Sequence, residues 1–393
     1  MKPSLRSGDH HGSHRHLLPA PGAAVGPARI DAVVVPTARP SRYLAHALRL
    51  SMDLRCPLVA LCSGRWTSAA EVRAMAPPGA EVVAVDVGGA EGLTLPRFET
   101  SQMLPRIFRR GTDTAAKRNL ALALARMLGW ARIVFLDDDI EVSAPDDLRR
   151  AAGLLDRFAA VGLSIGGFPD NSVVCHAYRA VGGKQDSFVG GGALAVETTR
   201  NIAFFPDIYN EDWFYLLEAD GLRPLAVTGQ VRQARYDPFR TPDRARTEEL
   251  GDVLAEGVFW LLDEGRTIAD AHRSHWVDFL ARRRRFIVSV LDRVPAAGLE
   301  PGERRRMEEA LKASLGRLTL ITPELCLGYL DAWRADLKVW RDFVTCLRPA
   351  RTVREALRAL TAPGHAPPHL QLRLPKVAEA RPDPSSSSDR LPV

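Results

Sequence analysis

Short apolar runs alternate with longer amphipathic stretches between residues 29 and 250. The apolar runs are rich in β-branched residues and contain few polar ones, so we expect strands that are buried on both faces. The predicted strands are 30–36, 57–62, 81–87, 131–137, 159–167, 188–197 and 224–233. Two stretches between them, 41–54 and 114–130, have the periodicity of helices. This alternation predicts an α/β fold with a mostly parallel, Rossmann-like sheet flanked by helices.

After residue 250 the strand pattern gives way to helical periodicity. Pro295, Pro301, Pro323 and Pro349 separate the helical stretches, as expected for a residue that ends or starts helices. The predicted helices are 249–265, 267–294, 303–318 and 323–348. We therefore expect a sheet-containing domain at 29–250, followed by an α-helical C-terminal module at 251–361.

The two ends of the chain, 1–28 and 362–393, are rich in polar residues, proline, glycine and serine. Such segments bury too little apolar surface to offset their ordering entropy, so both are predicted to be disordered tails. The first tail also contains His10, His11, His14 and His16. Metal binding by these histidines is the alternative to a solvated tail, and composition favours the tail.

Bulk properties narrow the class of protein. The 393 residues carry a formal net charge of +6 that is spread along the chain, which suits phosphate-bearing ligands without indicating nucleic acid. Five cysteines, with no CxxC pair, predict neither a disulfide framework nor a zinc knuckle. No apolar run of about 18 residues is present, so no transmembrane segment is expected and a cytoplasmic location is the default prediction.

A basic block, ARRRRF at 281–286, lies on one predicted helix that is otherwise amphipathic. A run of charges is usually a solvated helix face, and that is the favoured interpretation. The alternative is a weak peripheral contact with an anionic membrane or with an acidic acceptor.

The stretch IVFLDDDIEV, residues 133–142, ends a predicted strand in three consecutive carboxylates. Ligands of open α/β sheets bind beyond the carboxyl ends of the strands, where Asp137, Asp138 and Asp139 are expected. Adjacent carboxylates are stable when a divalent cation neutralises them, and Mg²⁺ is usually held by one or two carboxylates plus substrate phosphates. A solvated turn is the alternative, because aspartate is common in turns.

Three other stretches contain residues that are expected to act together with this strand end. VVVPTARP (33–40) ends the first strand, and the helix that begins AAKRN carries Lys117 and Arg118 where they would meet a diphosphate. NEDW places Glu211 and Asp212 among aromatic residues. In addition, Gly190–Gly192 would let a ligand approach the backbone closely.

In this order and spacing, VVVPTARP, KRN, FLDDD and NEDW resemble the family 2 glycosyltransferases of the GT-A fold, over about residues 30–240. Members of this family move a sugar from a nucleotide-diphosphate donor to an acceptor hydroxyl with inversion. The resemblance therefore implies a hexosyltransferase-like enzyme that needs Mg²⁺ or Mn²⁺, with a nucleotide sugar and an unidentified hydroxyl acceptor as its partners.

Carried over residue by residue, the resemblance makes Asp139 the principal metal ligand and Asp137 a ligand of the metal or of the ribose. Asp138 is the middle position of the motif. Asp212 is the catalytic base, with Glu211 beside it. The residues implied in nucleotide-sugar binding are Pro36, Thr37, Arg39, Arg118, Asp137, Asp138 and Gly191.

Two departures from the family leave the donor open. Many members end the second strand with an aspartate that pairs with uracil, where this chain has Ser63 and Gly64, and Asp86 is a weak substitute. Members often supply a late histidine to the metal, but 229–239 contains none. The residues left for that contact are Arg232, Gln233 and Arg235.

Other classes explain less of the pattern. A protein that binds a nucleotide sugar without turnover would have no need for the carboxylate of Asp212. A phosphatase of the haloacid dehalogenase type needs threonine or valine two residues after the second aspartate, where this chain has Glu141. A nucleotidyltransferase would need a glycine-rich loop after the first strand, and PTARPSR has no glycine.

Overall fold

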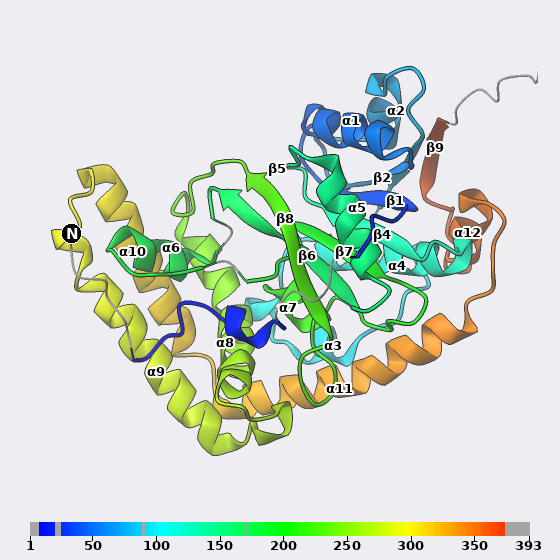
Figure 1. The fold of residues 1–393 in the computed structure, drawn as a ribbon. Helices are drawn as coiled ribbons and strands as arrows, with labels where there is room; N and C mark the ends of the chain where they lie inside the picture. Colours follow the sequence, from blue (N-terminus) through cyan, green and yellow to red (C-terminus); the bar gives the residue numbers. More distant parts are fainter. Residues whose placement is uncertain (1–7, 20–24, 89–91, 170, 187, 374–393) are drawn as a thin grey trace, which may run out of the picture.

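The computed structural model describes residues 8–19, 25–88, 92–169, 171–186 and 188–373 (Figure 1). Within these residues, nine strands form one sheet in the order β5-β8-β6-β7-β4-β1-β2-β3-β9. The strands are β1 (Ala32–Thr37), β2 (Leu58–Cys62), β3 (Val82–Asp86), β4 (Arg132–Leu136), β5 (Ile140–Glu141), β6 (Ala160–Gly167), β7 (Ala193–Glu197), β8 (Leu225–Gln233) and β9 (His369–Arg373). Each of the seven predicted strands is present, and β5 and β9 are additional.

Helices cover both faces of this sheet (Figure 1). They are α1 (Ala45–Leu54), α2 (Ala69–Met75), α3 (Glu99–Met103), α4 (Thr114–Leu128), α5 (Pro145–Leu154), α6 (Val173–Ala180), α7 (Glu211–Tyr215), α8 (Pro242–Asp263), α9 (Arg273–Leu291), α10 (Pro301–Leu318), α11 (Pro323–Cys346) and α12 (Val353–Ala359). The α/β class is confirmed, and so are the predicted helices at 41–54 and 114–130.

The sheet is mixed in direction. β1 pairs in parallel with β2 and β4, β2 with β3, and β6 with β8. The pairs β4–β7, β6–β7, β5–β8 and β3–β9 are antiparallel. The prediction of a mostly parallel sheet therefore holds for β3-β2-β1-β4 and for the pair β6–β8, whereas β5, β7 and β9 are paired antiparallel, because an apolar run predicts a strand but not its direction.

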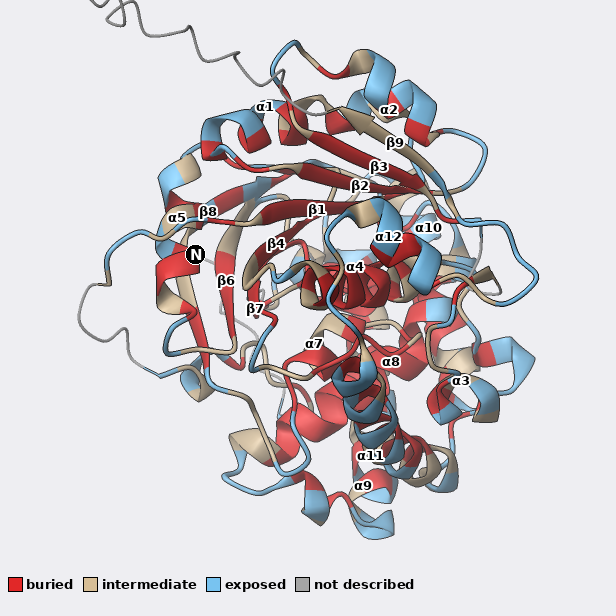
Figure 2. Ribbon diagram, turned by 90° about the vertical axis from the view of Figure 1, so that its right-hand side faces the viewer, coloured by how far each residue is buried: buried red, intermediate tan, exposed pale blue. Residues whose placement is uncertain are grey.

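The central strands are buried on both faces, as their apolar composition predicts (Figure 2). Along β1, Ala32 and Val34 belong to the core that includes α4, α8 and α11, whereas Val33 and Val35 belong to the core under α1, α2 and α5. This follows from the alternation of side chains along a strand. The rigid central sheet fixes where its strand ends, and hence the site, lie.

The helical C-terminal part shares the core of the sheet domain. α8 begins at Pro242, so the predicted boundary at 250 falls inside a helix. From α7, Phe214 contacts Tyr329 and Trp333 of α11 edge-to-face, with ring centroids 5.7 and 5.6 Å apart. The predicted helices are present, and they form a further layer of the same core.

The N-terminal segment 8–19 is folded onto α8 and α9 (Figure 1). His14 is 2% exposed and lies between two buried carboxylates, with Nδ1 2.6 Å from Asp263 and Nε2 3.3 Å from Glu256. The prediction of a disordered tail is therefore wrong for residues 8–19. Composition misled because these histidines are matched to acidic residues that are distant in sequence.

The C-terminal prediction also needs correction. Strand β9 pairs with β3 along its whole length, so 369–373 is not a disordered tail, whereas 374–393 lies outside the described residues. β9 was missed because its HLQLR sequence follows a stretch rich in proline and glycine. Its half-buried leucines, Leu370 and Leu372, pack against the edge of the core.

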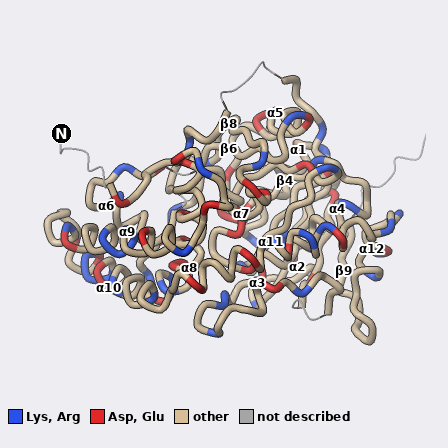
Figure 3. Tube along the Cα trace, turned by 90° about the horizontal axis from the view of Figure 1, so that it is seen from below, with Lys and Arg blue, Asp and Glu red and all other residues tan. Residues whose placement is uncertain are grey.

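The basic block 281–286 is not a uniformly solvated face. Arg283 is 2% exposed and pairs with Glu249 and Asp252 of α8, and Phe286 is fully buried. In the view of Figure 3, basic and acidic residues are interspersed along the chain. No helix among the described residues has the length and apolarity needed to cross a membrane.

Candidate active site

The three aspartates occupy a turn that the sheet holds on both sides. After β4 ends at Leu136, the backbone N–H of Asp137 donates to Gly192 O (2.9 Å), and Ala234 N–H donates to Asp139 O (2.9 Å). Strand β5 then pairs with β8 immediately after the turn. The carboxylates are therefore fixed at the strand end.

The side chains of the three aspartates point to different partners. Asp137 accepts from Arg118 Nη2 at 3.0 Å, whereas Asp138 accepts from the Thr37 hydroxyl at 2.6 Å. Arg39 reaches Asp139 at 2.9 Å and Asp138 at 3.3 Å. Asp138 is thus bonded to the end of β1 and to the loop that follows it. In the sequence motif Asp138 was only the middle position. The pattern leaves Oδ2 of Asp137 and Oδ1 of Asp139 without a hydrogen bond from a described residue.

These carboxylates fit a hard divalent cation. Burial raises the pKa of Asp137 to about 6 against the opposing charge of Arg118, and Asp139 and Asp138 raise it further. Burial also raises the pKa of Asp138, although the hydrogen bond from Thr37 opposes this. A cation bound at Asp137 Oδ2 and Asp139 Oδ1 would relieve the repulsion among these carboxylates. Mg²⁺ or Mn²⁺ held by one or two carboxylates and a diphosphate suits this donor set.

A cavity of about 630 Å³ opens on the β1 side of the strand end. Pro36, Thr37, Ser63 and Gly64 contribute to its wall. At its base Lys117 is buried, with Nζ donating to Thr37 O (2.9 Å) and Ser63 Oγ (2.6 Å). The N-terminus of α4 also faces this space, and its N–H groups favour an anion here, whereas the charge of Lys117 is already paired with Asp113, whose Oδ1 lies 2.9 Å from Nζ.

Asp86 does not face this cavity. Its Oδ1 accepts from Ala69 N at the start of α2 (2.6 Å), and its Oδ2 lies 3.0 Å from His369 Nδ1 of β9. Because both oxygens are engaged elsewhere, the structure offers no base contact from Asp86. Ser63 and Gly64 are the residues at the end of β2 that border the space.

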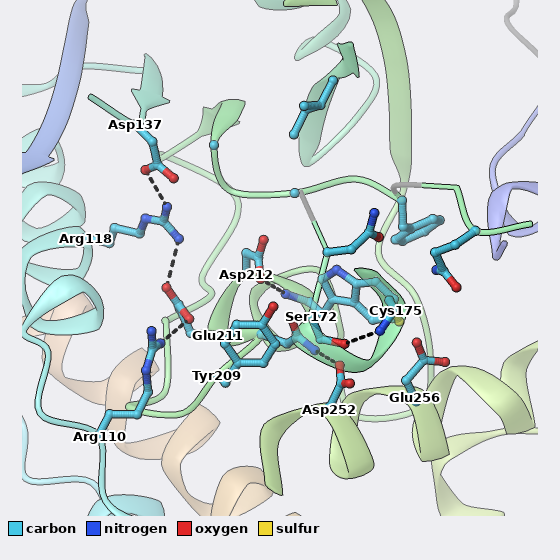
Figure 4. A pocket seen from close by; sticks show the side chains of 18 residues that line it. Arg110, Arg118, Asp137, Ser172, Cys175, Tyr209, Glu211, Asp212, Asp252 and Glu256 are labelled. Atoms are coloured by element: carbon cyan, nitrogen blue, oxygen red, sulfur yellow. Dashed lines mark hydrogen bonds and ion pairs between the residues drawn. The ribbon is translucent and has the colours of Figure 1, made fainter. Parts of the chain in front are cut away.

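A second cavity, of about 140 Å³, lies on the other side of Asp137 (Figure 4). Arg118 stands between Asp137 and Glu211 in this view, and Arg110 approaches Glu211 from the opposite side. The lining residues are Arg110, Arg118, Asp137, Ile165, Asn171, Ser172, Cys175, Gln185, Phe188, Gly190, Gly192, Tyr209, Asn210, Glu211, Asp212, Trp213, Asp252 and Glu256. Asp137 and Asp212, predicted from motifs 75 residues apart in the sequence, thus border one space.

Arg118 is a buried bridge rather than an exposed diphosphate contact. It is 3% exposed, with Nη2 3.0 Å from Asp137 and Nη1 3.2 Å from Glu211. A Cβ at Gly191 would lie 2.4 Å from Arg118 Nη1. The missing side chain of Gly191 therefore makes room for Arg118, whereas the sequence suggested room for a ligand.

The three residues of the KRN motif serve different parts of the site. Lys117 faces the larger cavity and Arg118 the smaller one. Asn119 is buried and exchanges two hydrogen bonds of 2.8 Å with the backbone of Phe205, which precedes α7. The helix start thus ties the strand-end aspartates to the acidic motif, a link that the sequence did not indicate.

Glu211 and Asp212 differ in their availability. Glu211 uses both oxygens on arginines, with Oε1 3.2 Å from Arg118 and Oε2 2.7 Å from Arg110. Asp212 accepts from Gly191 N–H (2.6 Å) and from Trp213 N–H (3.0 Å), and no cation pairs with it directly among the described residues. Burial raises the pKa of Asp212, and the charge of Glu211 raises it further. Asp212 is therefore better placed than Glu211 to accept a proton.

The late segment 232–235 lies beside the aspartates through its backbone. Gln233 is paired with Ile140 and is buried, whereas the side chains of Arg232 and Arg235 are exposed. Among the described contacts, none joins these three side chains to Asp139. Their nearness to the strand end follows from the β5–β8 pairing.

Several lining residues were not predicted from the sequence. Cys175 and Glu256 come from α6 and α8, and no local motif surrounds either of them. His176 is a structural residue, because it stacks on Phe168 and lies 2.9 Å from the Tyr236 hydroxyl. Trp213 packs against Phe259, with ring centroids 4.6 Å apart, and so belongs partly to the core.

No protein-family model matches the chain, and no curated protein matches its sequence. Among solved structures, the mannosyltransferase PcManGT from Pyrobaculum calidifontis in complex with GDP-Man and Mn²⁺ is similar over 83% of this chain and 91% of that chain. The identity is 19% and the TM-score 0.37. A likeness of this degree does not carry the ligands of that protein over to this chain, whose function has to be inferred from its own residues.

Proposed function

We propose that this protein is a metal-dependent glycosyltransferase of the GT-A type that moves a sugar from a nucleotide diphosphate to an acceptor hydroxyl with inversion. One observation carries the proposal: the cavity that contains Asp137 of the strand end also contains Asp212 of the acidic motif. Carboxylates on two sides of one small space suit a reaction in which one side holds the leaving group and the other deprotonates the nucleophile.

The donor would lie across the strand end. Its nucleoside would occupy the larger cavity, bordered by Pro36 and Thr37, with Lys117 at its base. Its diphosphate would then reach Asp137 and Asp139, where Mg²⁺ or Mn²⁺ would neutralise charge on the leaving group. Arg39, which pairs with Asp138 and Asp139 and is 47% exposed, is placed to contact the phosphates or the ribose.

The sugar would project into the smaller cavity toward Asp212. Since Glu211 is held by two arginines, Asp212 is the carboxylate available to take the proton of the acceptor hydroxyl. Its raised pKa improves it as a base, and such a step typically contributes ~10²–10⁴-fold to the rate. A single base opposite the leaving group is the arrangement that inversion requires.

The metal requirement is tested by thermal unfolding with a panel of nucleotide sugars, with and without Mn²⁺. The matching donor should stabilise the wild type only when Mn²⁺ is present, by roughly 2.7 kcal/mol at 100 times its dissociation constant. Asp139→Ala should lose this stabilisation, and the exposed control Asp146→Ala should keep it. Equal stabilisation of Asp139→Ala and the wild type would overturn the metal assignment.

The base is tested with Asp212→Asn and the donor identified by that panel. This variant should bind the donor as the wild type does and should lose transfer by ~10²-fold or more. A protein that only binds nucleotide sugars would show no transfer in either form. Transfer at the wild-type rate in Asp212→Asn would show that another group is the base.

A further inference from the structure

A second group of potential metal ligands lies at the far wall of the smaller cavity. His10 of the N-terminal segment, Cys175 of α6 and Glu256 of α8 bring one nitrogen, one sulfur and one oxygen atom within 4.8 Å of one another. All three side chains are buried. They come from parts of the chain that are distant in sequence, so the fold has gathered them.

The surroundings hold the imidazole of His10 in place. Its ring stacks on Phe286 at 4.1 Å between centroids and meets the edge of Tyr178 at 5.5 Å. Gln185 Oε1 lies 2.5 Å from His10 Nε2, and the N–H of the following residue, Asp186, donates to the backbone O of Gly12 (2.7 Å), two residues after His10. The segment is therefore seated by aromatic packing and by a backbone hydrogen bond.

The ligand types point to a particular class of cation. Thiolate, imidazole and carboxylate are together the ligands of Zn²⁺, whereas Mg²⁺ and Mn²⁺ prefer oxygen alone. A thiolate and a carboxylate supply two negative charges, which match a divalent ion in a buried place. Without a cation, Cys175 would be an inert buried thiol, His10 would bond to Gln185 and Glu256 to His14, and that is the alternative to exclude.

We propose that His10, Cys175 and Glu256 bind one Zn²⁺, with Gln185 Oε1 completing four ligands. Because Cys175, Gln185 and Glu256 line the smaller cavity, the ion would fasten the N-terminal segment to that cavity's wall. This site is separate from Asp137 and Asp139 and does not depend on the reaction proposed for them. Its role is structural, as expected where protein ligands fill the coordination sphere.

Cobalt substitution tests the site without an activity assay. Reduced, metal-free, full-length protein without an affinity tag is titrated with Co²⁺, and the near-ultraviolet thiolate-to-cobalt absorption is followed. The wild type should develop this band to an end point of one Co²⁺ per chain, and Zn²⁺ should abolish it. Cys175→Ala and His10→Ala should lose the band.

Matched variants separate this site from other cation ligands. Asp139→Ala removes the proposed catalytic ligand, His16→Ala an exposed histidine of the same segment and Cys346→Ala the exposed cysteine, and all three should keep the band. Circular dichroism establishes that each variant is folded. Absence of the band in the wild type overturns the proposal, as does a band that persists in a folded His10→Ala variant.

Discussion

Arg118 is the single charge that joins the two carboxylate motifs. It lies at 3.0 Å from Asp137 and 3.2 Å from Glu211, and it is almost fully buried. Among the described residues Arg118 Nε has no hydrogen-bond partner, so the buried charge of Arg118 is compensated mainly by these two ion pairs. Removing one partner of a buried ion pair is costly, since the charges that remain have no compensation.

Arg118→Met should therefore lower the free energy of unfolding by about 3–5 kcal/mol, measured by denaturant titration. Arg126→Met is the control, because Arg126 lies on the same helix, is half-buried and, within the described part of the chain, bonds only to the backbone carbonyl of Thr199. Arg126→Met should lower the free energy of unfolding by about 1 kcal/mol. Equal losses for the two variants would contradict the bridging role of Arg118.

Asp207 supplies a prediction about pH. Burial raises its pKa from 3.8 to about 6, against Arg110, with Glu211 and Asp113 raising it further. Because Asp207 binds its proton more tightly in the folded state than in the unfolded state, protonation of Asp207 stabilises the fold. This stabilisation is complete below pH 3.8 and is lost as the pH rises through 6. Above that pH the ionised carboxylate destabilises the fold by at most on the order of 3 kcal/mol.

Asp207→Asn removes this ionisation. Its melting temperature should exceed that of the wild type at pH 8 and should match it at pH 4, a comparison made by calorimetry at both values. The control is Asp331→Asn, at an exposed position. Its difference in melting temperature from the wild type should be the same at both pH values. A constant offset between Asp207→Asn and the wild type at both pH values would argue against a raised pKa.

At the scale of elements, the sequence predicted what depends on local pattern. The strands β1 to β4 and the helix α4 follow from apolar runs and helical periodicity, and the aspartates at the end of β4 follow from strand-end geometry. The link between Arg118 and Glu211 spans 93 residues, so no local pattern contains it. The folded segment 8–19 was missed for the same reason, since its partners lie on α6, α8 and α9.

Strand β9 is a further element that composition hid. Leu370 and Leu372 pack on the core from the edge of the sheet, while Gln371 points to the other face. Leu370→Asp with Leu372→Asp should lower the free energy of unfolding by roughly 2 kcal/mol, because two half-buried leucines lose apolar contact. Gln371→Asp, measured in the same denaturant titration, should cost less than about 0.5 kcal/mol. Similar losses of unfolding free energy in the double leucine variant and in Gln371→Asp would mean that β9 contributes no packing.

At the scale of the whole molecule, two cavities of different character lie near the strand-end aspartates: Asp137 lines the smaller one, and Asp138 bonds to Thr37, which lines the larger one. The larger one is bordered by the loops after β1, β2 and β3 and by the start of α4, whereas the smaller one is bordered by α6, α7 and α8. The parallel half of the sheet thus builds one side, and the helical layer with the antiparallel half builds the other. Such a division suits a donor that spans the boundary and an acceptor that enters from the helical side.

This division predicts that the two substrates can be weakened separately. Ala38→Trp adds bulk to the larger cavity and should weaken donor binding on the order of tenfold, as measured by calorimetric titration. Asn171→Trp adds bulk to the smaller cavity and should leave donor binding unchanged while raising the KM for the acceptor by a similar factor. If Asn171→Trp weakened the nucleotide and Ala38→Trp did not, the nucleoside would have to lie on the helical side. The assignment of the two cavities would then be reversed.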